Sequence, residues 1–362
     1  MRPRRPGRKK RAFADRKPRG ARCPGVAPEG NQHLPADSPP RRQAHRAAHS
    51  RRRWFGYLVA VAVTALAAYL LYRTLSQYEW SELVDAVTAI SAQRLFAALG
   101  FSALSYLTLT GFDWLALRHV GHRLSYGKVA TASFTSLSIG HTLGLAALSS
   151  GAIRYRFYSR WGLRGGEVAE VIVFCGVTVG LGLALLGGAA LLFAPDIAVN
   201  AFGLGRGVVR VAAAVALAGP VVYLVMAALI RRPFSIRGRE IRMPALKFAL
   251  AQVALGSLNY VFLAAALHQA VLSIADIGYL PVAAAAVSAN VATIITHVPG
   301  GLGVVEAVLV YLLPGRELIG PILIFRFVYF LVPLCFGLAT LGLSELLLSR
   351  ARPKRARRDQ SR

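Results

Sequence analysis

A helix-breaking turn with a carboxylate just beyond it interrupts a long apolar stretch of the chain. No residue from 279 to 305 carries a formal charge, and this stretch leads into the run Pro299-Gly300-Gly301-Leu302-Gly303-Val304-Val305-Glu306. A Pro-Gly-Gly turn ends a helix, and broken helices at membrane depth occur where the backbone is buried in protein or lines a cavity. An ionisable side chain such as Glu306 beside the break therefore marks a candidate functional site.

The break itself could hold an anion. A new helix can start at Leu302, and its free N–H groups and positive dipole end would attract a group such as a lipid phosphate. Gly300, Gly301 and Gly303 would let a ligand approach the backbone closely. The alternative is a plain kink between packed helices.

Glu306 has a candidate partner in Arg326. A rise of about 1.5 Å per helical residue, counted from the ends of their segments, places the two side chains at similar depths of roughly 10 Å and 9 Å. A buried Glu–Arg pair would limit the cost of each charge. Two interpretations stay open: a substrate that competes with this pair, and a permanent ion pair.

Several polar residues within apolar runs could contact the same ligand. His297 lies two residues before the break, Asn290 lies earlier in the same run, and His141 lies in the middle of an earlier polar stretch. A lone His or Asn in a membrane helix is more often an interhelical hydrogen-bonding residue than a ligand. The same alternatives apply to Asn259.

The segment from residue 150 to residue 158 combines basic and aromatic side chains. Arg154 and Arg156 could grip a phosphate at the cytoplasmic interface. The alternative is that both are ordinary anchors that extend to the membrane surface within an aromatic belt. Composition alone favours the anchors.

Hydropathy predicts the elements that must position these residues. The chain of 362 residues is 55% hydrophobic and 16% charged, and several uncharged apolar runs reach the roughly 20 residues that span a bilayer. We expect an all-α multi-span membrane protein with six full spans and two re-entrant hairpins, hence eight helical elements in the membrane. The predicted spans are residues 54–72, 95–117, 171–193, 211–230, 248–271 and 328–348, the hairpins are 129–152 and 279–313, and a surface helix is expected within 80–92.

The distribution of basic residues favours this arrangement. With a cytoplasmic N-terminus and two hairpins, 37 of the 43 Lys and Arg residues lie on the cytoplasmic side, as the positive-inside rule requires. The order of span, span, hairpin and span then occurs twice, in residues 54–193 and 207–348. Because each half crosses the membrane three times, the halves would form an inverted repeat, the architecture of many transporters.

The two ends of the chain are basic. Residues 1–53 hold 17 Lys and Arg against three acids, and residues 349–362 hold seven basic residues and one acid. We expect cytoplasmic tails, disordered at the N-terminus, that control topology rather than segments that bind nucleic acid or anionic lipid. The three cysteines show no pairing or zinc-binding pattern, and we expect neither a metal nor a cofactor.

Two runs carry a resemblance to a known family. Ser150-Gly151-Ala152-Ile153-Arg154-Tyr155-Arg156 and the run from Pro299 to Glu306, in this order and separation, resemble the transmembrane region of lysylphosphatidylglycerol synthases, a flippase-like family. The resemblance covers about residues 54–348. In bifunctional members this region is implicated in moving aminoacylated phospholipid between leaflets, while a separate soluble domain, expected to be absent here, performs the aminoacyl transfer. The resemblance adds Arg154, Arg156, Gly300, Gly301 and Glu306 as site candidates and does not identify the substrate.

We therefore expect a multi-pass protein of the cell membrane, with both termini cytoplasmic, that translocates or binds a lipid and is not an enzyme. Its partner would be an anionic phospholipid or a lipid-linked head group, without nucleic acid, and a synthase or a second copy of the chain could assemble with it. No nucleotide-binding motif occurs, so transport would be downhill or driven by an ion gradient. The alternatives are an accessory subunit of envelope glycolipid synthesis and an intramembrane lipid-modifying enzyme, for which the acids Asp113, Glu306 and Glu345 are few.

Overall fold

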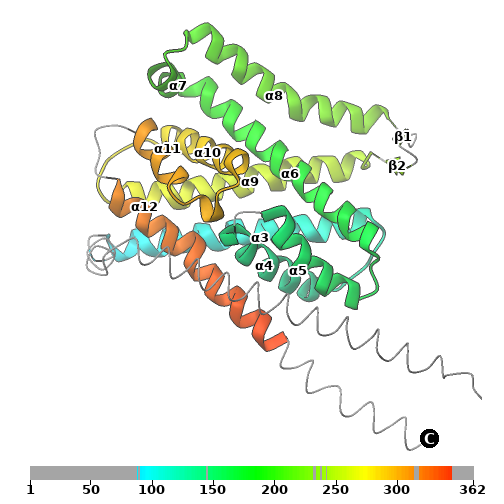
Figure 1. Ribbon diagram of the computed structural model, residues 1–362. Helices are drawn as coiled ribbons and strands as arrows, with labels where there is room; N and C mark the ends of the chain where they lie inside the picture. Colours follow the sequence, from blue (N-terminus) through cyan, green and yellow to red (C-terminus); the bar gives the residue numbers. More distant parts are fainter. Residues whose placement is uncertain are drawn as a thin grey trace, which may run out of the picture. The chain divides into compact units, whose positions relative to one another are not determined.

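The computed structural model describes residue 88 and residues 90–143, 146–230, 234–236, 239–241, 243–313 and 318–344. The predicted first span at 54–72, most of the predicted surface helix and both basic tails lie outside the described residues. Within the described part, the protein is almost entirely helical (Figure 1).

Six helices are long and apolar enough to cross a membrane, which confirms the predicted all-α multi-span class. Five of them coincide with predicted spans. The sixth, α10, was expected as the first arm of a hairpin. The six are α3 (Ala92–His119), α6 (Gly165–Phe193), α8 (Arg206–Leu229), α9 (Leu246–Val271), α10 (Tyr279–Thr296) and Ile319–Ser344, which begins with α12 (Ile319–Arg326) and the π-helical turn η2 (Phe327–Leu331).

Shorter elements connect these helices. A two-stranded antiparallel ribbon joins α8 to α9 and pairs Phe234 with Ile241. The predicted hairpin regions each hold two consecutive helices. The shorter elements are α4 (Tyr126–Leu143), α5 (Ala146–Arg160), α7 (Pro195–Phe202), β1 (Phe234–Ile236), β2 (Arg239–Ile241), the 3₁₀ turn η1 (Pro299–Gly301) and α11 (Val304–Leu312).

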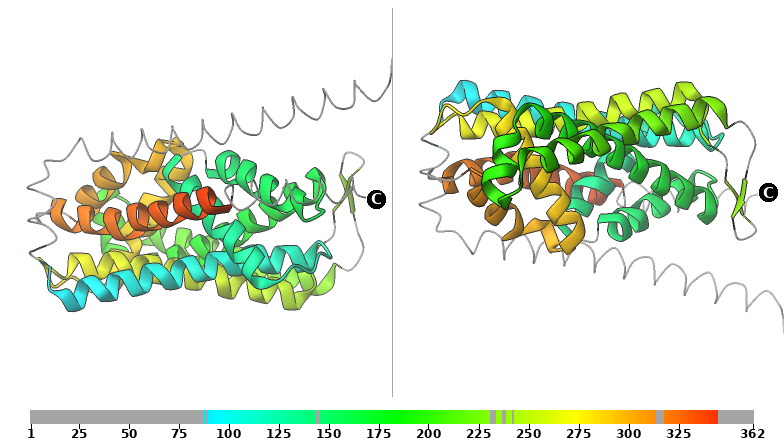
Figure 2. Two further views of the ribbon diagram at one scale, coloured as in Figure 1. Left: turned by 90° about the horizontal axis from the view of Figure 1, so that it is seen from below. Right: turned by 90° about the horizontal axis from the view of Figure 1, so that it is seen from above.

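We call the helices of the two predicted hairpin regions, α4 with α5 and α10 with α11, the two short helix pairs. They reach opposite ends of the helix bundle (Figure 2). The pair α4 and α5 begins and ends where α3 ends and α6 begins, an end at which His122 Nε2 lies 3.2 Å from Glu167 Oε1. The pair α10 and α11 begins and ends at the other end, where the Phe202 and Tyr311 rings lie 6.2 Å apart. This placement is compatible with two hairpins that enter from opposite sides. Their re-entrant nature and the inverted repeat stay predictions.

Close helix packing in the centre depends on small residues. Helix α3 makes its most extensive contacts with α9, and α9 also packs against α6. At the α6–α9 crossing, Gly182 faces Gly256, and a Cβ on Gly182 would lie 2.3 Å from the Gly256 carbonyl oxygen. Small residues let backbones approach in membranes, where packing rather than the hydrophobic effect holds helices together. The glycine pair therefore sets how closely α6 and α9 approach each other.

Replacing Gly182 with valine should separate α6 from α9. Overpacking typically costs about 1–3 kcal/mol, and we expect the melting temperature of the detergent-solubilised protein to fall by about 5 °C or more. The matched control is Gly180→Val, because a Cβ there meets no atom within 4 Å. Equal melting temperatures for the two variants would contradict the close glycine contact.

Candidate functional site

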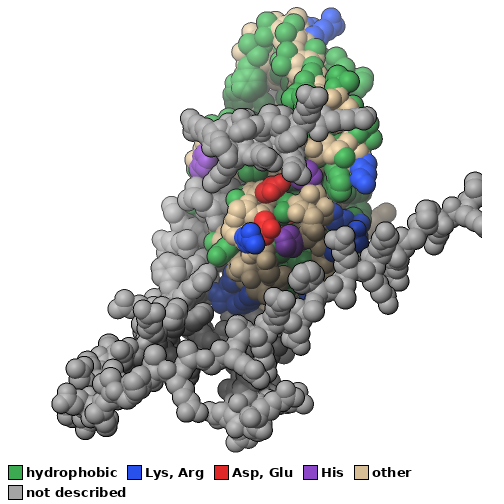
Figure 3. Space-filling view, turned by 90° about the vertical axis from the view of Figure 1, so that its right-hand side faces the viewer, with side chains coloured by type: hydrophobic (Ala, Val, Ile, Leu, Met, Phe, Trp, Pro, Cys, Tyr) green, Lys and Arg blue, Asp and Glu red, His purple; other side chains and the backbone are tan. Residues whose placement is uncertain are grey.

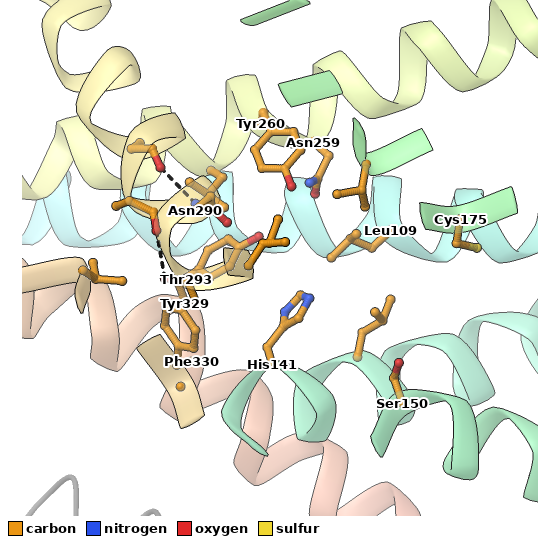
Figure 4. A pocket seen from close by; sticks show the side chains of 18 of the residues that line it. Leu109, His141, Ser150, Cys175, Asn259, Tyr260, Asn290, Thr293, Tyr329 and Phe330 are labelled. Carbon is orange, nitrogen blue, oxygen red and sulfur yellow. Dashed lines mark hydrogen bonds between the residues drawn. The ribbon is translucent and has the colours of Figure 1, made fainter. Parts of the chain in front are cut away.

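A cavity of about 510 Å³ lies within the helix bundle, between the two short helix pairs. Its wall is mainly apolar, and polar side chains reach it from several helices (Figure 4). It draws on both predicted halves of the chain. The polar wall residues are His141, Ser150, Arg154, Asn259, Tyr260, Asn290, Thr293, His297 and Tyr329.

The Pro-Gly-Gly break meets the end of α4 at this cavity. A Cβ on Gly300 would lie 3.5 Å from the Thr142 carbonyl oxygen. Gly300 and Gly301 have φ angles of 59° and 60°, a region in which glycine alone is free of steric cost. His297, two residues before Pro299, adopts φ 53° and ends α10 in the left-handed conformation. The break is thus a sharp turn built from consecutive left-handed residues.

The helix after the break starts two residues later than expected. We predicted a start at Leu302, but α11 begins at Val304, because Gly303 has φ 78° and cannot belong to the helix. The Gly303 N–H donates to Glu306 Oε2 at 2.9 Å. The positive end of α11 therefore already faces an anionic group, the carboxylate of Glu306.

The predicted pair of Glu306 and Arg326 is confirmed. Arg326 Nη2 donates to Glu306 Oε2 at 2.7 Å, and Arg326 Nε donates to Oε1. The same guanidinium donates to the carbonyl oxygens of Gly300 and Gly301, each at 3.0 Å. Neither Arg326 nor Glu306 lines the cavity. Of the two interpretations, this geometry favours the permanent ion pair. Arg326 lies behind the cavity wall and stabilises the turn.

A second buried ion pair holds α5 to α3. Arg154 Nη2 donates to Asp113 Oδ1 at 2.9 Å, and Arg154 Nε donates to Oδ2 at 3.0 Å. Tyr158 Oη donates to the same carboxylate at 2.7 Å, and Cys175 Sγ on α6 donates to it at 3.1 Å. The Asp113 side chain is fully buried. One carboxylate thus joins three helices, and the buried Arg154 is not the surface anchor that composition favoured.

The site residues predicted from the sequence fall into two groups. His141, Asn290, His297, Gly300 and Arg154 line the cavity, as a shared site requires. The others do not line it: Gly301, Gly303, Glu306 and Arg326 form the turn and its support, and Arg156 lies half-buried on α5.

Sequence reasoning gave little weight to two important residues and did not single out a third. Asp113 was set aside because it lies near the end of its span, although it is the one acid in the run 95–117. Asn259 was weighed as a ligand and as an interhelical residue, with the interhelical interpretation favoured, and Tyr260 was not singled out. Among the described residues, no three His, Cys, Asp or Glu side chains gather as a metal site.

Breaking the Asp113–Arg154 pair on one side should cost more than removing both partners. Asp113→Leu leaves a buried guanidinium without its carboxylate, a loss of about 3–5 kcal/mol, whereas replacing both partners with apolar residues often costs less. We expect the melting temperature of Asp113→Leu to lie below that of the double variant Asp113→Leu/Arg154→Met. A double variant that melts lower than Asp113→Leu would contradict this ordering.

The chain is similar to known membrane proteins along most of its length. The uncharacterized protein slr0712 of Synechocystis is 30% identical over 303 residues, which are 79% of this chain and 89% of that protein. The inner membrane protein YbhN of Escherichia coli is 28% identical over 311 residues, 83% of this chain and 93% of that protein. Residues 57–337 match the family described as the lysylphosphatidylglycerol synthase TM region. The chain therefore belongs to this family of multi-pass membrane proteins.

Proposed function

We propose that the protein translocates or binds a membrane lipid, whose polar head group enters the cavity between the two helix pairs. The observation that carries this proposal is the position of the cavity, at the point where the end of α4 meets the Pro-Gly-Gly break inside a multi-span helix bundle. Breaks of this kind in membrane helices surround substrate sites in transporters.

The cavity has the polarity that an amphiphile needs. Its wall is mainly apolar, with polar groups in the interior, and about 510 Å³ falls in the range of small-molecule sites. Part of the wall is open to the outside, since Ile294 is 50% exposed and both Gly176 and His297 are exposed. An apolar opening on the flank of a membrane helix suits acyl chains that stay in the bilayer.

Transport or binding fits the buried charges better than catalysis. The enzyme alternative that the sequence left open depends on carboxylates that can reach a substrate. The acids of the described apolar helices that sequence analysis considered, Asp113 and Glu306, are both held by arginines and do not line the cavity. The described cavity wall therefore offers no carboxylate pair to a substrate. Cargo would cross by alternating exposure of the cavity, downhill or coupled to an ion gradient.

The basic residues support a cytoplasmic location for the end of the bundle at which α3 ends. Figure 3 looks onto this end and shows Lys and Arg, His and acidic side chains gathered there. Basic residues mark the cytoplasmic side of membrane proteins. Those of the described part at this end are Arg118, Arg123, Lys128, Arg156, Arg160, Arg164, Arg239 and Lys247, against Arg94, Arg206 and Arg210 at the other end. With the crossings predicted from sequence, both termini are cytoplasmic.

A bulky side chain at the cavity wall should block lipid movement. Gly176 lines the cavity and a Cβ there meets no atom within 4 Å, so Gly176→Phe can fold and fill the opening. We expect fluorescent phosphatidylglycerol to move between the leaflets of reconstituted vesicles at least roughly fivefold more slowly than with the parent protein. Dithionite quenching measures the transfer, with and without a proton or sodium gradient.

The matched control is Gly180→Phe, one turn further along α6, which has equal space for a Cβ and does not line the cavity. This variant should transfer lipid at the parent rate. Equal slowing in both variants would place the transfer path elsewhere. A parent protein that neither moves labelled lipid nor retains lipid after purification would remove the proposal.

A further inference from the structure

Two buried polar side chains, Asn259 and Tyr260, and the half-buried His141 line the cavity with hydrogen-bonding capacity that the described protein does not use. Tyr260 is 5% exposed and its hydroxyl makes no hydrogen bond within the described residues, and neither do the ring nitrogens of His141. Asn259 is 3% exposed, and only its carbonyl oxygen has partners. Figure 4 shows all three around the same space, with His141 reaching toward it from α4 and the other two from α9. The only fully buried side-chain N or O atom without a partner among the described residues is Thr135 Oγ1, so these polar groups are accessible from the cavity, where a bound group can complete their hydrogen bonds.

The carbonyl of Asn259 faces a chain of hydroxyl groups. Ser105 Oγ donates to Asn259 Oδ1 at 2.7 Å. The Tyr329 hydroxyl lies 2.8 Å from Ser105 Oγ and must act as the donor, since the Ser105 proton is already used. The carbonyl of Asn259 therefore points to Ser105, and its two N–H donors are left for the cavity.

The three side chains form a mixed set of donors and acceptors. Asn259 offers donors, while the Tyr260 hydroxyl and a neutral His141 ring can each donate and accept. Hydroxyl groups also donate and accept, whereas an ionised phosphate only accepts. A group that bears several hydroxyls can thus satisfy all three residues at once, and a phosphate would leave acceptors unmatched.

The charges of the cavity wall also favour an uncharged ligand. Arg154 is the one Lys or Arg of the described wall, and its charge is balanced by Asp113 directly behind it. The second guanidinium, Arg326, is balanced by Glu306 and does not reach the cavity. A further full charge would enter a low-dielectric space without a free counter-charge, which is costly.

We propose that the middle of the cavity binds the uncharged, hydroxyl-bearing part of a lipid head group, a sugar or a polyol, through His141, Asn259 and Tyr260. This assignment rests on the proposed lipid-binding role of the cavity and names the class of head group it selects. It moves the recognition site away from the Pro-Gly-Gly turn, toward neutral residues on α4 and α9.

The test compares two probes that differ only in the head group. Purified protein in nanodiscs is titrated with glucosyl dioctanoylglycerol and with dioctanoyl phosphatidic acid, and dissociation constants are measured by native mass spectrometry. We expect the glucoside to bind at least about fivefold more tightly. Tyr260→Phe and His141→Phe should each weaken glucoside binding by about threefold to tenfold, the range for one neutral hydrogen bond, and leave phosphatidic acid unchanged.

Tyr223→Phe is the matched control, because Tyr223 donates to Gln252 away from the cavity wall. It should bind the glucoside as the parent does, and melting temperatures of all variants confirm folding. Tighter binding of phosphatidic acid, or unchanged glucoside binding in both cavity variants, overturns the head-group assignment while the lipid-binding role stands. Failure of the parent to bind either probe or dioctanoyl phosphatidylglycerol overturns the proposed function as well.

Discussion

The pairing of each buried arginine with a carboxylate is the constraint on which the rest of the structure depends. A guanidinium inside an apolar helix bundle must have a carboxylate within hydrogen-bonding distance, since an unpaired charge there costs several kcal/mol. Arg154 meets this need through Asp113 and so fixes α5 against α3. Arg326 meets it through Glu306 and also holds the carbonyl oxygens of the Pro-Gly-Gly turn. Each pair thus attaches one short helical segment to a long helix.

The cavity lies beside the elements that these ion pairs hold. One pair holds α5 to α3, and the other holds the Pro-Gly-Gly turn and α11 to α12. At this turn, Gly300 approaches the Thr142 carbonyl oxygen, and left-handed backbone at Gly300 and Gly301 turns the chain back. A continuous helix would fill this space with side chains. The interrupted helices leave a cavity into which neighbouring helices place polar groups.

Sequence reasoning reached the features that depend on one segment or on two that follow each other in the chain, and missed those that depend on packing. Hydropathy located five long helices, although the last of them begins at Ile319, nine residues before its predicted start, and depth along two neighbouring segments matched Glu306 to Arg326. Asp113 and Arg154 lie on separate elements, and their contact appears only once α5 packs against α4 and α6, which also contact α3. The start of α11 was placed too early because the left-handed conformation of Gly303 depends on the turn as a whole.

The ion pairs also decide what kind of selectivity the cavity can have. Arg154 was a sequence-based candidate for phosphate binding, since a guanidinium matches phosphate geometry, and Arg326 was a candidate partner of Glu306 for which a substrate could compete. In the folded protein, Arg326 directs all three of its nitrogens to Glu306 and the turn, and Arg154 shares its charge with Asp113. The charges that stabilise the architecture are therefore balanced before any ligand arrives. Discrimination among head groups then falls to neutral donors and acceptors, where each mismatched hydroxyl leaves a buried polar atom without a partner.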